Sequence, residues 1–162
     1  MVIKKINKQG YFSKVVGKPG NKGCSGDNGP ANTAQVTIVA GIAVTNREEI
    51  VWADVECNKV RKVTEDGFTT AIAGTSDTSL HSTGSGIAFS TSLTSPRSVS
   101  FMDNGDMLVA DADYLKKVDI NGIVSLATET RFSDLGEVFV TGDGDILIAD
   151  RGANCIYQIK NR

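Results

Sequence analysis

Residues 41–74 read GIAVTNREEIVWADVECNKVRKVTEDGFTTAIAG, and this stretch decides the fold. It contains four short apolar runs, separated by turn signals such as EDG. In the run IVWAD both sets of alternating side chains are apolar, whereas a strand exposed on one face alternates apolar with polar residues. The stretch therefore predicts a unit of four antiparallel strands with both faces covered.

The unit is repeated along the chain. The segment VWAD (51–54) returns 57 residues later as LVAD (108–111), and again as LIAD (147–150). Units of this length, each a small antiparallel sheet, are typical of blades stacked around an axis. We expect one domain over residues 1–162, with a half blade at 1–17, blades at 39–74 and 96–128, and a partial blade at 135–160.

These units resemble the NHL-repeat family of β-propellers. The matching pattern is GIAV, VWAD, KVRKV and FTTAIAG in this order, preceded by SGDNGPA (25–31). The resemblance covers nearly the whole chain, and it implies an all-β propeller of about six blades. It also implies a non-catalytic module that binds protein partners. The third copy departs from the pattern, because the long loop between blades is missing there.

Roughly three blades are present, whereas known propellers have at least about four. An open stack would leave the apolar faces of its first and last blades in water. Two arrangements stay open. Two copies of the chain could form one ring, or the chain could be part of a longer propeller or of a larger assembly that covers its ends.

The stretch GCSGDNGPANTA (23–34) contains residue types found in active-site loops. It departs at Asp27 from the turn Gly-x-Ser-x-Gly, and the only histidine, His81, is the counterpart of Cys24 in the next unit. We therefore predict no catalytic residue, and we interpret the stretch as a loop between two blades.

No cofactor is expected either. The resemblance implies one enzyme alternative, a lactonase or amidating lyase with a divalent metal such as zinc in the channel. The first strands offer a single acid for such a metal, Glu137. Calcium at the turns DNGD (103–106) and TGDGD (141–145) is a further alternative, but we expect hairpin turns there.

Residues that recur from unit to unit are interpreted as structural. An aspartate at the end of a strand can accept backbone N–H hydrogen bonds and fix the next turn. A repeated glycine supplies turn geometry. The repeated positions are Asp54, Asp111, Asp150, Gly29 and Gly86.

Basic doublets recur in the third strand of the units. Stacked blades could align them into a ladder on the outer wall, which would contact an acidic protein surface or, as a further alternative, an RNA backbone. They could instead pair with nearby acids across strands. Since the net charge is −2 and aromatic residues are few, nucleic acid is not the expected partner. The candidate partner-binding residues are Lys4, Lys5, Arg61, Lys62, Lys116 and Lys117.

The three cysteines, Cys24, Cys57 and Cys155, lack C-x-x-C spacing. Their odd number fits free thiols in a reducing compartment, with one pair plus one free thiol as the alternative. The first ten residues lack the apolar segment of a signal peptide, and no apolar run is long enough to span a membrane. These observations favour an intracellular protein, and the resemblance implies that it binds a protein partner or forms a larger assembly.

Overall fold

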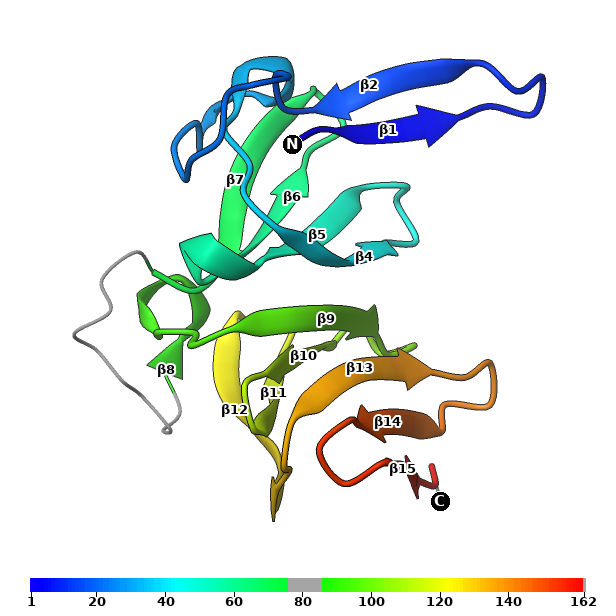
Figure 1. The fold of residues 1–162 in the computed structure, drawn as a ribbon. Coiled ribbons are helices and arrows are strands. Elements are labelled where there is room, and N and C mark those ends of the chain that lie inside the picture. The colour runs from blue at the N-terminus through cyan, green and yellow to red at the C-terminus, as the bar shows by residue number, and fades with distance from the viewer. Residues whose placement is uncertain (76–85, 162) are drawn as a thin grey trace.

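The computed structural model describes residues 1–75 and 86–161 (Figure 1). These residues form four antiparallel sheets that follow one another in chain order, which confirms the predicted all-β fold of propeller blades. The helical elements of the described chain are short 3₁₀ turns, and none is long and apolar enough to cross a membrane.

Two complete blades share one strand order. Each begins with the strand that lies beside the neighbouring blades and continues outward through three hairpin-linked strands. The first blade contains β4 (Val39–Val44), β5 (Ile50–Asp54), β6 (Lys59–Val63) and β7 (Phe68–Ala73). The second contains β9 (Pro96–Phe101), β10 (Met107–Asp111), β11 (Tyr114–Val118) and β12 (Ile123–Arg131).

A short fifth strand covers the outer edge of each complete blade. β3 (Gly29–Pro30) pairs with β7, and β8 (Gly86–Ile87) pairs with β12. Each is followed by a 3₁₀ turn, η1 (Ala31–Thr33) or η3 (Ala88–Ser90), whose first residue is buried. The loop between blades therefore also closes the edge of the blade that follows it, a role that was not predicted.

Two smaller sheets flank the complete blades. In Figure 1 a blue hairpin lies beside the first complete blade, and an orange-to-red sheet lies beside the second. The hairpin consists of β1 (Ile3–Ile6) and β2 (Phe12–Val16). The other sheet consists of β13 (Leu135–Val140), β14 (Ile146–Asp150) and β15 (Cys155–Ile159).

The core lies between neighbouring sheets. On β5, Val51 packs toward the second complete blade, whereas Trp52 packs toward the β1–β2 hairpin. On β10, Val109 packs toward the first complete blade, whereas Leu108 packs toward β13–β15. Each of these side chains is almost fully buried, which stabilises the fold by about 1.5–3 kcal/mol per side chain. Contact with a sheet on either side explains why these strands are apolar on both faces.

The preference for three free thiols was wrong. Cys24 and Cys57 form a disulfide with a Cα–Cα distance of 5.4 Å, and Cys155 is free. Cys57 ends the 3₁₀ turn η2 (Val55–Cys57), so the disulfide ties the long loop to the end of strand β5. The spacing did not reveal this pair, because the two cysteines are 33 residues apart and meet only when the loop folds back over the blade.

Candidate functional site

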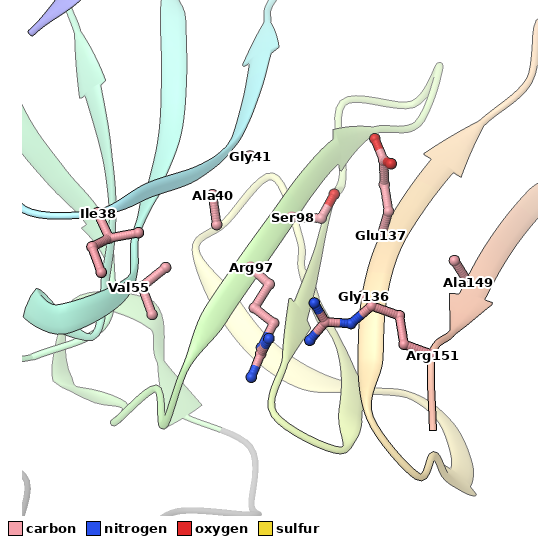
Figure 2. A pocket seen from close by; sticks show the side chains of 10 residues that line it. All are labelled: Ile38, Ala40, Gly41, Val55, Arg97, Ser98, Gly136, Glu137, Ala149 and Arg151. Atoms are coloured by element: carbon pink, nitrogen blue, oxygen red, sulfur yellow. The ribbon is translucent and has the colours of Figure 1, made fainter. Parts of the chain in front are cut away.

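The inner strands of three successive sheets line one pocket (Figure 2). β4, β9 and β13 lie side by side, and residues at or near their N-terminal ends surround a cavity of about 540 Å³. This volume falls within the range of small-molecule sites. Two sets of equivalent repeat positions supply much of the lining. The first set is Ala40, Arg97 and Gly136, and the second is Gly41, Ser98 and Glu137.

Small residues let the inner strands approach one another. A Cβ atom at Gly41 would lie 2.7 Å from the carbonyl oxygen of Arg97, so β4 and β9 touch there through their backbones. Ser98 Oγ lies 3.3 Å from both the carbonyl oxygen and the N–H nitrogen of Val138, which joins β9 to β13. A close backbone approach and two hydrogen bonds therefore join the three strands at the pocket wall.

Two arginines share one carboxylate at one end of the pocket. Arg151 follows β14, and its Nη2 donates to Asp134 Oδ1 at 3.0 Å. Arg97 Nη2 lies 3.7 Å from the same oxygen. Figure 2 shows the two guanidinium groups beside each other, with Glu137 pointing away from them at the other end. Because one carboxylate faces two guanidinium groups, this end of the pocket is electropositive.

Neither arginine was among the candidate residues of the sequence analysis. A signal was present in the repeat, since Arg97 stands where the other units have Ala40 and Gly136. Arg151 stands directly after the repeated aspartate, where the first unit has Val55. A charged residue that only one unit contains is not required by the blade itself.

The repeated aspartates share one geometry. Asp111 accepts hydrogen bonds from the N–H groups of Thr94 and Ser95, both at 2.8 Å. These bonds hold the segment that leads into the first strand of the same blade, whereas the sequence analysis placed them in the following turn. The equivalent bonds run from Thr37 to Asp54 at 3.3 Å, and from Ser133 and Asp134 to Asp150 at 2.9 and 3.0 Å.

Asp150 makes a bond in the following turn as well, because Ala153 N–H donates to it at 3.1 Å. The hydrogen bond from the N–H of Ser133, supported by the other N–H donors, lowers the pKa of Asp150 below its ordinary value. The carboxylate is therefore held in its charged form.

Gly29 and Gly86 occupy equivalent places in β3 and β8. A Cβ atom at Gly86 would lie 3.0 Å from Thr91 Oγ1, and one at Gly29 would lie 3.3 Å from the carbonyl oxygen of Gly26. A side chain at either position would require its neighbour to shift by a few tenths of an ångström.

Of the two arrangements considered for the basic doublets, a ladder on the outer wall is not what the complete blades show. Arg61 is fully buried and Lys116 is 4% exposed, while Lys4 and Lys5 of β1 are exposed. Successive side chains of a strand point to opposite faces, so one member of each doublet in the complete blades points inward. The outer members are paired: Lys62 lies 2.7 Å from Glu49, and Lys117 lies 3.6 Å from Asp106.

Arg61 is the centre of a buried ion cluster. Its Nε donates to Asp27 at 2.8 Å, and its Nη1 contacts Asp54 at 3.2 Å. The same guanidinium donates to the carbonyl oxygens of Gln35 at 2.7 Å and Ser25 at 3.2 Å. Asp27, the residue that breaks the Gly-x-Ser-x-Gly pattern, therefore fastens the loop to the blade.

Within residues 1–75 and 86–161, no three His, Cys, Asp or Glu side chains are placed to hold a metal ion. Turns DNGD and TGDGD each join two strands of a sheet, and Asp145 accepts hydrogen bonds from Gln158 Nε2 at 2.7 Å and Asn161 N–H at 2.9 Å. His81 lies outside the described residues.

No family model and no curated protein matches the sequence. Solved structures do match. An auxiliary nutrient binding protein from Bacteroides thetaiotaomicron has a TM-score of 0.69 at 11% identity, with 98% of this chain and 42% of that chain covered. Virginiamycin B lyase from Staphylococcus aureus has a TM-score of 0.58 at 12% identity, with 99% and 48% covered. A gluconolactonase from Xanthomonas campestris has a TM-score of 0.57 at 16% identity, with 74% and 37% covered.

The chain thus spans less than half the length of each of these three structures. At such low identity the likeness concerns the fold alone, because one fold serves many functions. The chain has the fold of part of a β-propeller.

Proposed function

We propose that this chain is a non-catalytic β-propeller module of the NHL type that assembles through its open blade edges, and that its partner is a second copy of the same chain. The observation that carries the proposal is the edge of β15. Among the described strands, β15 pairs with β14 and no fourth strand covers its other side. An uncovered strand edge is a template for pairing with another chain.

The side chains of β15 support this assignment. Ile156 is 74% exposed, Tyr157 43% and Ile159 39%, although the equivalent strands of the complete blades are largely buried. A contiguous apolar strand that is exposed in this way marks an interaction surface. We expect a β-strand to bind this edge of β15, since the edge presents backbone hydrogen-bonding groups as well as apolar side chains.

The β1–β2 hairpin is the complementary element. It exposes apolar side chains: Tyr11, directly before β2, is 73% exposed, and Phe12 in β2 is 72% exposed. The β1–β2 hairpin and the three strands β13–β15 are the smaller sheets of the described chain, and pairing the two across copies would give one larger sheet at each junction. The same arrangement would give a ring of about six blades.

Mass in solution tests the proposal. Sedimentation equilibrium of residues 1–162 is expected to give about twice 17.1 kDa at micromolar concentration, because specific interfaces of this kind hold at that level. A monomer at every concentration up to about 1 mM would contradict it, since an affinity weaker than that corresponds to only about 4 kcal/mol.

Matched lysine substitutions locate the interface. Ile156→Lys on β15 is expected to shift the mass toward the monomer, because it places a charge on the proposed contact. Ile123→Lys is the control: Ile123 is 40% exposed, but it lies on β12, whose edge β8 already covers. Equal effects of the two variants would show that the contact does not involve the β15 edge.

A further inference from the structure

We infer that the pocket between β4, β9 and β13 binds a small organic carboxylate, with Arg97 and Arg151 holding the carboxylate group and an apolar wall holding the rest of the ligand. This inference does not depend on the assembly proposed above, because all the lining residues come from one copy of the chain.

The repeat provides the first argument. A residue that every blade needs recurs in every unit, as the buried aspartates do. Arg97 and Arg151 instead interrupt the pattern, and both do so in the lining of the same cavity. The units with Ala40, Gly136 and Val55 at these positions form the same strands without a cation. Packing of the blade therefore does not account for the two charges.

The contacts of the two guanidinium groups provide the second argument. Within the described part of the chain, Arg97 Nε is buried and has no hydrogen-bond partner. The distance of 3.7 Å from Arg97 Nη2 to Asp134 Oδ1 is too long for a good hydrogen bond. Arg151 is 51% exposed at its side chain, so it also has donors that face solvent. Guanidinium donors that lack a protein partner or face solvent can bind a carboxylate. Its two oxygens can accept a pair of hydrogen bonds from one guanidinium, in bidentate fashion.

The apolar part of the lining indicates the rest of the ligand: Ile38 and Val55 lie on one side of the arginines and Ala149 on the other (Figure 2). Ile38, Val55 and Ala149 line the cavity, and Ile38 remains 45% exposed. An apolar surface next to two cations suits an acid with a short hydrocarbon body rather than an inorganic anion. Glu137 points away from the arginines, and its charge disfavours a second anionic group at that end (Figure 2).

Hexanoate is a suitable probe, and the measurement is a titration followed by the amide NMR signals of β9 and β13. A ligand of this size is expected to bind with a dissociation constant of about 1 mM. Hexan-1-ol and hexylamine have the same apolar body, and both are expected to bind at least about tenfold more weakly, since neither accepts a bidentate pair of hydrogen bonds. Binding of hexylamine as tight as that of hexanoate would overturn the inference, and so would binding of inorganic phosphate at the same strength.

Variants separate recognition from folding. Arg97→Gln and Arg151→Gln are each expected to weaken hexanoate binding about tenfold. Asp134→Asn is expected to act in the opposite direction, with binding about threefold tighter, because it removes the carboxylate that competes for both arginines. Damage to the fold would not tighten binding.

Arg131→Gln is the matched control. Arg131 also pairs with a carboxylate, that of Asp113 at 2.9 Å, but it lies at the end of β12 and not in the pocket. Its substitution is expected to leave the dissociation constant unchanged. If Arg97→Gln behaved like Arg131→Gln, the assignment of the carboxylate site would be wrong.

Discussion

The two complete blades have the same strand order but fasten their incoming loops differently. In the first blade, Arg61 on the third strand contacts two carboxylates and two carbonyl oxygens, and a disulfide adds a covalent link. In the second blade, Lys116 at the equivalent place lies 2.8 Å from Asp111 and donates to the carbonyl oxygen of Ser92 at 3.1 Å. The sequence has no cysteine near this second loop.

The difference shows that the same blade can hold its incoming loop with either of two cations. A loop that crosses from one blade to the next must be held against the blade it enters, and a buried cation on the third strand does this in both cases. A guanidinium has five donors in a fixed fork, whereas an ammonium is a compact charge with three. Arg61 can therefore contact loop positions that lie far apart, and Asp27 is needed to balance it.

The largest expected effect comes from removing the cation of the first blade. Arg61→Ala leaves Asp54 buried and Asp27 largely buried with no guanidinium beside them, and should lower the free energy of unfolding by about 3–5 kcal/mol. Lys116→Ala should lower it less, by about 2–3 kcal/mol, because an ammonium has three donors where a guanidinium has five. Urea unfolding followed by circular dichroism measures both.

Equal losses in these two variants would contradict the comparison, since they would mean that the extra contacts of Arg61 stabilise nothing. The double variant Arg61→Ala with Asp54→Asn sharpens the result. It should recover part of the loss, because the buried carboxylate of Asp54 is then neutral and no longer needs the cation.

Reduction of the disulfide comes next in size. The bond between Cys24 and Cys57 closes a loop over a sequence separation of 33 residues, and its loss should cost about 2–4 kcal/mol. The measurement is urea unfolding with and without a reducing agent. The double variant Cys24→Ser with Cys57→Ser should match the reduced protein and should not respond to the agent. A response in that variant would assign the effect to another part of the chain.

Asp27 is expected to matter less than the cation it balances. Asp27→Ala removes the partner of both Arg61 Nε and Lys59 Nζ, each at 2.8 Å, and should cost about 1.5–3 kcal/mol. The control is Glu56→Ala, which breaks the exposed pair with Lys22 and should change stability by at most about 1 kcal/mol. If the two variants cost the same, Asp27 is no more than a surface charge.

These residues also show how far the sequence alone could lead. Local patterns predicted the all-β propeller-like fold correctly, because apolar periodicity and turn residues act over a few positions. The inward direction of Arg61, its pairing with Asp27 and the Cys24–Cys57 bond depend on how the loop folds back over the blade. Such contacts between distant positions leave no local signal. The pocket arginines could have been noticed in part, since Arg97 interrupts the repeat in the sequence, but the repeat did not show that Arg97 and Arg151 line the same pocket.

The smallest expected effect concerns the turn between the second and third strands. The first blade uses four residues there and ends them with Asn58 at φ 51°, whereas the second uses two, with Ala112 at φ 52°. An alanine in the left-handed region costs about 1–2 kcal/mol, and asparagine tolerates that region better. Ala112→Gly should therefore raise the free energy of unfolding by about 0.5 kcal/mol after its entropic cost, while Asn58→Gly should raise it by less or lower it. A destabilised Ala112→Gly variant would mean that the shorter turn is not strained. The comparison of the two blades would then rest only on how each blade holds its incoming loop.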